Sequence, residues 1–215
     1  MTSRTLSDKR DKTIRHILEA AAKTFSEVGF EGARMDEIAK RAAVNKATIY
    51  YHIGDKKSLY AEVLHDIIGN ALERSLSNLQ DTQSPEEKLK NYINSVTHTM
   101  DQHPYLAPIM MREQISGGQN LPEATALLLA NIIGKVTDIL QEGAKQGVFI
   151  ETIPFIVHSM VIGGVMFYKA SDPVRSKYAA FPETVKKLDK KLSGSVAEEI
   201  EKLILRAIKK ERIPA

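Results

Sequence analysis

Side chains that can donate hydrogen bonds to phosphates or to base edges cluster in one short stretch of this 215-residue chain. They are Asn45, Lys46, Thr48, Tyr50, Tyr51 and His52. Few of these side chains belong in an apolar core, whereas small and aliphatic residues recur in the stretch 38–44 just before them. Residues 35–56 therefore read as two short helices joined by a tight turn. This is the pattern of a helix-turn-helix, whose second helix is held outward to enter a groove of duplex DNA.

The rest of the chain must hold this stretch in place, and its apolar spacing predicts helices from end to end, hence an all-α fold. The expected helices cover 11–28, 35–42, 46–52, 56–79, 85–102, 104–115, 122–146, 152–169 and 182–210, with a break near 192–195 in the last. Gly29 is placed to end the first helix in the left-handed conformation. Asn45, Asp55 and Ser84 are placed as N-caps, and Ser84 begins a Ser-Pro-Glu-Glu capping sequence.

We expect two domains: a helix-turn-helix domain over residues 1–55 and a larger helical domain over 56–215, linked by the long helix 56–79. Residues 1–60 hold 12 Lys and Arg against 8 Asp and Glu, whereas the remaining residues hold 18 against 19. A basic excess on one domain is the electrostatic footprint of DNA binding. An excess this small also fits an ordinary solvated surface, so the charge alone leaves both interpretations open.

Several functional classes lack their characteristic residues here. The chain has no cysteine, which excludes disulfides and thiolate metal ligands. It has no glycine-rich phosphate loop, no HExxH and no GxSxG sequence, so we expect neither an enzyme nor a bound metal or cofactor. The apolar stretch 155–168 is too short to span a bilayer, and the N-terminus has no secretory pattern. We therefore expect a cytoplasmic protein with no membrane partner.

The N-terminal residues resemble the TetR family of bacterial transcriptional regulators. The matching residues are Ile17-Leu18-Glu19-Ala20-Ala21, Phe25, Gly29, Met35-Asp36-Glu37-Ile38-Ala39, Val44-Asn45-Lys46-Ala47-Thr48-Ile49-Tyr50-Tyr51-His52, Lys56 and Leu59. Residues 80–215 match the family in length and helical character alone. The chain departs from the usual pattern at Arg34, Ala43 and Ile53, where the family often has a Ser or Thr cap, a Gly and a Phe. A left-handed Ala43 costs on the order of 1–2 kcal/mol, which a packed turn can absorb.

The resemblance implies that the second helix of the helix-turn-helix lies in the major groove of an operator. Lys46, Ala47 and Tyr51 would then lie nearest the bases. Phosphate contacts, which set the register without reading the sequence, are expected from Thr48, Tyr50, His52 and Lys56. The full expected set is Arg34, Asn45, Lys46, Ala47, Thr48, Tyr50, Tyr51, His52 and Lys56. Alternatively, Tyr50 is a half-buried packing residue and His52 an ordinary helix-terminal histidine.

A single helix-turn-helix reads few base pairs, so such proteins usually dimerise. The last two long helices are the candidates for the interface, because two adjacent glycines allow close approach and the final helix carries one apolar stripe. The candidate residues are Gly163, Gly164, Ile200, Leu203, Ile204 and Ala207. The resemblance implies a four-helix bundle across a two-fold axis. The alternative is that this stripe faces the core of its own protomer.

The resemblance also implies a small-molecule pocket among the middle helices. The side chains that could line it are Tyr92, Met100, Tyr105, Met110, Phe155, His158, Met166 and Phe167. Methionines adapt to irregular apolar ligands, although a Met or aromatic residue at helical spacing is more often plain core. The identity of the effector is not encoded in any motif.

Taken together, we expect a sequence-specific DNA-binding repressor, a homodimer that releases its double-stranded DNA operator when a small apolar effector binds the C-terminal domain. Release would follow from a repositioning of the linking helix 56–79, which changes the separation of the two DNA-reading helices. Two alternatives remain: a helical carrier of small hydrophobic ligands, and a DNA-binding protein without an effector.

Overall fold

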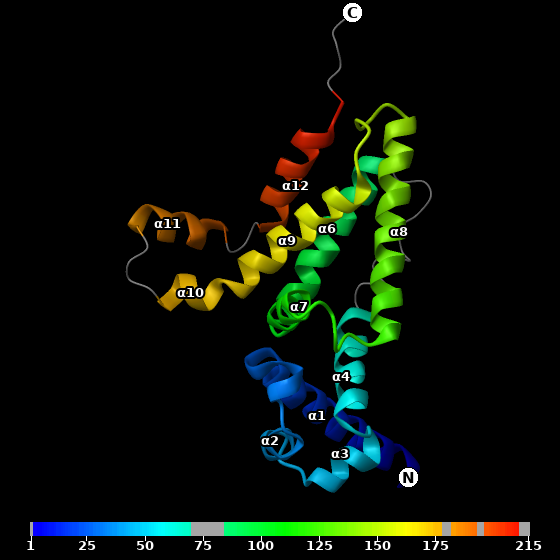
Figure 1. Ribbon diagram of the computed structural model, residues 1–215, viewed down its shortest axis with the longest axis vertical. Coiled ribbons are helices and arrows are strands. Elements are labelled where there is room, and N and C mark those ends of the chain that lie inside the picture. Colours follow the sequence, from blue (N-terminus) through cyan, green and yellow to red (C-terminus); the bar gives the residue numbers. More distant parts are fainter. Residues whose placement is uncertain (1, 70–83, 178–181, 193–195, 211–215) are drawn as a thin grey trace, which may run out of the picture.

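The computed structural model of the chain describes residues 2–69, 84–177, 182–192 and 196–210, and these are helical almost throughout (Figure 1). The N-terminal unit contains α1 (Thr2–Gly32), α2 (Met35–Arg41), α3 (Lys46–His52) and α4 (Lys56–Leu64). The C-terminal unit contains α6 (Pro85–Gln102), α7 (Leu106–Ile115), α8 (Glu123–Lys145), α9 (Pro154–Ala170), α10 (Asp172–Lys177), α11 (Glu183–Leu192) and α12 (Val196–Ile208). The expected all-α fold is confirmed.

Two left-handed residues shape the N-terminal unit. Gly29 has φ of 73° and interrupts α1, as its position predicted. Ala43 has φ of 54° in the turn between α2 and α3, where a glycine would cost less. The packing of Ile38 and Ile49, both fully buried on either side of this turn, holds the residue in that conformation. The turn therefore forms without the glycine that the family often places there.

The helix starts follow the predicted caps. The side chain of Asn45 accepts a hydrogen bond from the backbone of Thr48, and that of Asp55 does the same from Ser58. Ser84 forms a complete capping box at the start of α6. The bounds of α3 and α6 agree with the prediction because these short-range signals fix where a helix can begin.

Helix α4 continues into a single wide turn of π-helix over His65–Gly69. A Cβ on Gly69 would lie 2.8 Å from the imidazole of His65, so a larger residue here would displace that side chain. The predicted helix over 56–79 thus contains a π-helical turn that was not predicted from the sequence. Its last ten residues fall within 70–83, which lie outside the described residues.

The C-terminal unit is a helical bundle in which α6 packs on α8, α9 and α12, and α9 packs on α7. Its buried centre includes Ile93, Val136, Val161 and Val165. Figure 1 shows α10 and α11 projecting to one side of this bundle. The predicted segment 182–210 is two helices, with α11 ending at Leu192 and α12 beginning at Val196. Helix α10 was not predicted.

Candidate DNA-binding surface and effector cavity

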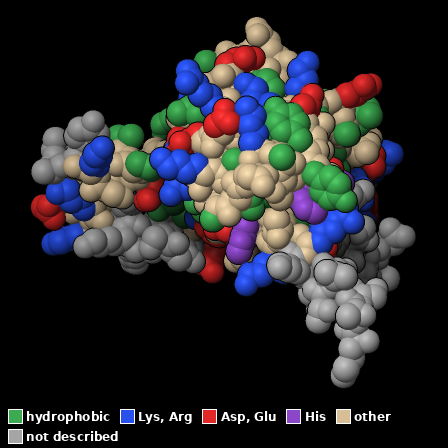
Figure 2. Space-filling model, turned by 90° about the horizontal axis from the view of Figure 1, so that it is seen from below, with side chains coloured by type: hydrophobic (Ala, Val, Ile, Leu, Met, Phe, Trp, Pro, Cys, Tyr) green, Lys and Arg blue, Asp and Glu red, His purple; other side chains and the backbone are tan. Residues whose placement is uncertain are grey.

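The recognition helix α3 stands outward from its own unit, as the helix-turn-helix interpretation requires. Ile49 is fully buried and anchors the helix, whereas Lys46 and Ala47 are exposed and Tyr51 is 84% exposed. Thr48 is half-buried, and its hydroxyl donates to Oδ1 of the Asn45 cap over 2.8 Å. Figure 2 views the molecule from this end and shows Lys and Arg side chains gathered around histidine and hydrophobic side chains.

Two charged residues flank the recognition helix. Lys46 forms an exposed ion pair with Asp36 of α2, with 3.1 Å between Nζ and Oδ2. Arg34 is exposed at the start of α2, where its side chain makes no capping hydrogen bond. Both cations therefore lie on the surface, and the carboxylate of Asp36 is the group that DNA would have to displace from Lys46.

The two tyrosines and the histidine of α3 differ in their surroundings. Tyr50 is 48% exposed, so its ring is partly available and partly packed. His52 is half-buried, with its ring edge-on to Tyr51 at 5.0 Å between centroids. The Nδ1 atom of His52 is buried and has no hydrogen-bond partner within the described part of the chain. Their contacts with DNA stay predictions.

Lys56 has a structural role that was not predicted from the sequence. Its ammonium donates to the carbonyl oxygen of Phe30 at 2.9 Å and to those of Glu31 and Ala33 at 3.4 Å each. It also lies 4.4 Å from the centroid of the Phe30 ring. The lysine thus holds the end of α1 and the link to α2 in place. Lys57, the next residue, is exposed.

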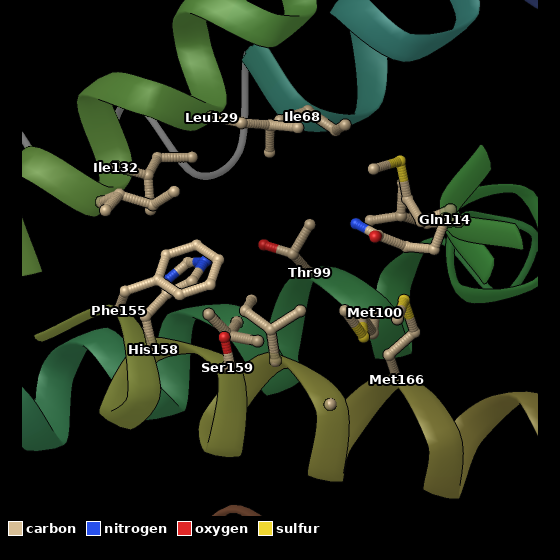
Figure 3. Close-up of a pocket in the computed structure, with 16 residues that line it drawn as sticks. Ile68, Thr99, Met100, Gln114, Leu129, Ile132, Phe155, His158, Ser159 and Met166 are labelled. Carbon is tan, nitrogen blue, oxygen red and sulfur yellow. The ribbon is translucent and has the colours of Figure 1, made fainter. Parts of the chain in front are cut away.

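A cavity of about 380 Å³ lies among the helices of the C-terminal unit, within the usual size range for small-molecule sites. It is lined by Ile68, Val96, Thr99, Met100, Leu106, Met110, Gln114, Leu129, Ile132, Ile133, Phe155, His158, Ser159, Ile162, Gly163 and Met166. None of these residues carries a carboxylate, an ammonium or a guanidinium group. Figure 3 shows Gln114 and His158 at opposite sides of a largely apolar chamber.

Five of the eight predicted pocket residues line this cavity: Met100, Met110, Phe155, His158 and Met166. Tyr92 is instead fully buried behind the lining, where its hydroxyl is 2.8 Å from Nδ1 of His158. Tyr105 lines a separate hollow against α1 and α4. Phe167 is 66% exposed on the outside of α9. These three residues therefore do not join the cavity wall.

The cavity also has walls that sequence reasoning missed. Helix α8 contributes Leu129, Ile132 and Ile133, and the wide turn after α4 contributes Ile68. The polar lining residues Thr99, Gln114 and Ser159 were missed as well. No motif marks these positions, because each one reaches the cavity through the way in which its helix crosses the others.

The predicted dimer residues divide between the inside and the outside of the protomer. Ile204 is buried, and a Cβ on Gly164 would lie 3.5 Å from Cδ1 of Ile200, so part of the stripe packs α12 on α9. Gly163 lines the cavity. Leu203 is 62% exposed and Ala207 is also exposed. Helix α9, which α12 contacts, also carries exposed apolar residues, namely Ile156, Met160 and Phe167.

Among the described residues, no group of three or more His, Cys, Asp or Glu side chains is placed to hold a metal ion. Within the same residues, no helix combines the length and the apolar character needed to cross a membrane.

Both units match known protein families. Residues 17–63 match the family described as bacterial regulatory proteins, tetR family. Residues 85–180 match the tetracyclin repressor-like C-terminal domain. The chain belongs to the TetR family, as the resemblance of its N-terminal residues predicted. It is a DNA-binding transcriptional regulator.

The chain is similar to several curated regulators. The transcriptional repressor NicS of Pseudomonas putida is 28% identical over 178 residues, which cover 81% of this chain and 84% of NicS. The regulator RutR of Escherichia coli is 28% identical over 145 residues, covering 67% of this chain and 66% of RutR. The negative regulator IcaR of the Staphylococcus aureus biofilm operon is 28% identical over 133 residues, covering 60% and 64%.

Solved structures share the architecture. The hemolysin II transcriptional regulator HlyIIR is 28% identical and superposes with a TM-score of 0.63, covering 94% of this chain and 99% of HlyIIR. The ketosteroid regulator KstR2 of Mycobacterium tuberculosis has a TM-score of 0.69 at 19% identity, with coverage of 98% and 97%. At that identity the second likeness supports the fold alone.

Proposed function

We propose that this regulator is a ligand-responsive repressor, which binds operator DNA as a dimer and releases it when a small, largely apolar molecule occupies the cavity. The similar proteins NicS and IcaR are named as a repressor and as a negative regulator, which supports repression. The apolar cavity in the C-terminal unit supports an effector, and favours this function over that of a DNA-binding protein without one. The recognition helix argues against a simple carrier.

The observation that carries the proposal is that α7 contacts both sites. Met110 and Gln114, one helical turn apart, line the cavity. Between them in sequence, Arg112 and Glu113 hold the DNA-binding unit. A ligand that shifts α7 through the first pair also shifts the second, because all four side chains project from one short helix.

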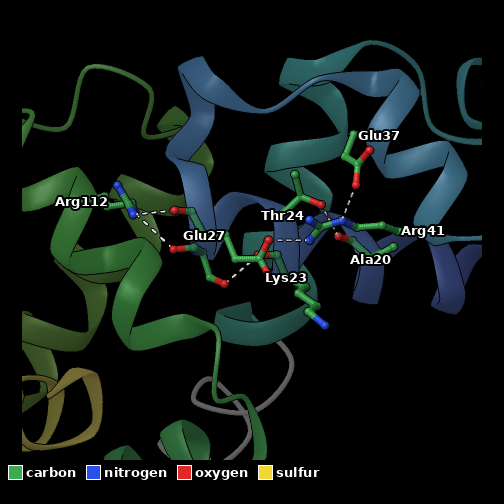
Figure 4. Close-up of polar contacts among 8 residues, drawn as sticks. Ala20, Lys23, Thr24, Glu27, Glu37, Arg41 and Arg112 are labelled. Carbon is green, nitrogen blue, oxygen red and sulfur yellow. Dashed lines mark hydrogen bonds and ion pairs between the residues drawn. The ribbon is translucent and has the colours of Figure 1, made fainter. Parts of the chain in front are cut away.

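Polar contacts continue from α7 to the helix-turn-helix (Figure 4). The guanidinium of Arg112 donates to the backbone carbonyls of Ser26 at 3.2 Å and Glu27 at 2.7 Å, near the end of α1. The carboxylate of Glu27 pairs with Arg41 of α2, which also pairs with Glu37. These exposed ion pairs add little stability individually, but together they join α7 to α1 and α2.

The energetic requirement is a difference in affinity between two arrangements. A ligand shifts the protein toward the arrangement that it binds better, and one that binds both equally causes no release. The two recognition helices of a dimer must match the spacing of two half-sites. We propose that the exposed apolar face of α9 and α12 forms this dimer, and that residues 1–55 and 56–215 act as the two domains, with α4 between them.

The experiment blocks the cavity without touching the DNA-binding surface. A Cβ on Gly163 meets no atom within 4 Å, so Gly163→Leu can fill the chamber from α9. Gly134→Leu is the matched control, because Gly134 is also a helical glycine with open space around its Cβ, but does not line the cavity. An operator is first selected from random DNA, and small apolar molecules are then screened for its release by fluorescence anisotropy.

Light scattering first verifies that Gly163→Leu is still a dimer, because Gly163 is also a predicted interface residue. We then expect this variant to bind the operator but to require at least tenfold more of any releasing molecule. Gly134→Leu should respond like the wild type. Release that persists unchanged in Gly163→Leu would place the effector elsewhere and contradict the proposal.

A further inference from the structure

The polar contact beneath the cavity wall determines what His158 presents to a ligand. The hydroxyl of Tyr92 lies 2.8 Å from Nδ1 of His158. Tyr92 is fully buried, and burial raises the pKa of its phenol, which therefore keeps its proton. A buried hydroxyl hydrogen needs an acceptor, since leaving one unpaired costs about 1–3 kcal/mol.

That requirement selects one tautomer of the imidazole. If Nδ1 carried the hydrogen, the Tyr92 hydroxyl would accept it, and no other acceptor for the phenol hydrogen is found among the described residues. If Tyr92 donates to Nδ1 instead, the phenol hydrogen has its acceptor and Nδ1 has its donor. The hydrogen of the neutral ring then lies on Nε2. The buried phenol thus makes His158 a neutral ring whose Nε2–H is a hydrogen-bond donor.

The other residues of the cavity wall that the structure describes carry no charged side chain. The described lining residues include no acidic side chain, lysine or arginine. The hydroxyl of Thr99 already donates to the backbone carbonyl of Ser95 at 2.8 Å. The centroid of the Phe155 ring lies 6.4 Å from that of the His158 ring, on the same helix. Burial lowers the pKa of His158, in keeping with the neutral ring.

We propose that the effector is an uncharged, largely apolar molecule carrying one hydrogen-bond acceptor, such as a ketone, ester or amide carbonyl, which accepts the Nε2–H of His158. A carboxylate would enter without a cation to pair it and an ammonium without a carboxylate, so the neutral groups of the wall compensate the desolvation of either charge only in part. The inference rests on the proposed function of the cavity. It goes further by naming the chemical class of ligand and the residue that selects it.

The first experiment tests the tautomer without any ligand. Long-range proton–nitrogen NMR correlations on the ¹⁵N-labelled full chain distinguish Nε2–H, Nδ1–H and imidazolium forms of a histidine. We expect His158 to be in the Nε2–H form at neutral pH, and Tyr92→Phe to shift it to a mixture of the two neutral forms. A wild-type His158 in the Nδ1–H or imidazolium form overturns the inference.

The second experiment compares probes of one size. They are 2-octanone, its hydrocarbon isostere 2-methyl-1-octene, octanoate and octylammonium, each titrated against the full chain by ligand-observed NMR. We expect the ratio of ketone affinity to alkene affinity to be about fivefold higher in the wild type than in His158→Phe, the change that one net hydrogen bond provides. The comparison between variants cancels the different costs of removing the two probes from water, and circular dichroism verifies the fold of His158→Phe.

The outcomes separate the two proposals. Tighter binding of octanoate or octylammonium than of the ketone overturns the inference on ligand class and leaves a ligand-responsive repressor possible. A ketone preference that depends on His158, without release of operator DNA by any ketone that binds, supports the inference and contradicts the proposed regulation.

Discussion

Tyr60 of α4 and Glu113 of α7 share a buried hydrogen bond between the two units of the molecule, in which the phenol donates to Oε1 over 2.8 Å. Burial and the neighbouring carboxylate raise the pKa of Tyr60, so the phenol remains the donor. Oε2 of Glu113 is buried as well, and has no hydrogen-bond partner within the described part of the chain. The buried carboxylate of Glu113 therefore depends on Tyr60 for its hydrogen bond, and this contact fixes α7 against α4.

Tyr60→Phe is expected to destabilise the protein by about 1–3 kcal/mol, because it leaves both oxygens of a buried carboxyl group without a partner. The measurement is the free energy of unfolding from urea titration. The double variant Tyr60→Phe with Glu113→Met removes both polar groups and should recover much of the loss. Simple addition of the two single effects would mean that the hydrogen bond does not couple the residues.

Stability should depend on pH through His158. Burial lowers its pKa in the folded protein, so the unfolded chain takes up the proton first as the pH falls. The neutral ring contributes to the free energy of unfolding. This contribution is fully present above the pKa of the unfolded chain, near 6.5, and is lost as the pH falls toward and through the lower pKa of the folded protein. Between about pH 7.5 and pH 5.5 the wild type should therefore lose more unfolding free energy than His158→Gln does. Equal losses of unfolding free energy in the two proteins would show that His158 is not the source of the pH dependence.

The ion pair between Lys46 and Asp36 predicts opposite effects on DNA binding. Asp36→Asn should raise operator affinity, since it removes a negative charge next to the recognition helix and frees Lys46. Lys46→Ala should lower operator affinity by about 1–3 kcal/mol and change which operator is preferred, if Lys46 reads a base. Titrations at two salt concentrations measure both. Unchanged affinity in both variants would contradict the docking of α3.

Lys56→Ala is expected to lower the stability of the N-terminal unit, because three backbone carbonyls lose their shared donor. Hydrogen bonds from charged groups are worth about 1.5–3 kcal/mol, which thermal unfolding can resolve. Lys57→Ala is the matched control and should leave the melting temperature unchanged, since Lys57 is exposed. Equal melting temperatures for the two variants would contradict the structural role of Lys56 and leave the predicted phosphate contact as its function.

The dimer proposal predicts that a charge on the shared face of α9 and α12 separates the protomers. Phe167→Glu with Leu203→Glu should give a monomer at micromolar concentration by light scattering, because both side chains are more than half exposed in the single chain. Ile115→Glu is the control, because Ile115 is 85% exposed but lies on α7, which is not one of the two proposed interface helices, and this variant should remain dimeric. A monomeric wild type would rule out the interface itself.

The N-terminal unit could be predicted from sequence because its signals are local. Asn45 and Asp55 cap helices at their expected positions, and Gly29 adopts the left-handed conformation. Each of these depends on a few neighbouring residues. The outward exposure of Lys46 and Tyr51 follows from burial of Ile49 on the other face of a short helix.

The cavity could be predicted only in part, because it depends on how helices cross. The family resemblance pointed to His158 and Met166 among the side chains that could line a pocket, but the sequence could not tell the wall residue His158 from Tyr92 behind it. Nor could it place Phe167 outside, since exposed and buried apolar residues look alike in a single sequence. The carbonyls that engage Lys56 lie more than twenty residues away in sequence, beyond any local pattern.

The wide turn at His65–Gly69 sets the angle between two faces of one helix. Before it, Tyr60 packs on Phe25 of α1, and beyond its middle Ile68 lines the cavity. A π-turn contains one residue more than an α-turn, so later side chains are rotated by about 100° from where a regular helix would aim them. Conversion of this turn into regular α-helix, with every residue kept, would rotate Ile68 by about 100° away from the chamber. Sensing and DNA binding would then be disconnected in a protein whose two ends were each intact.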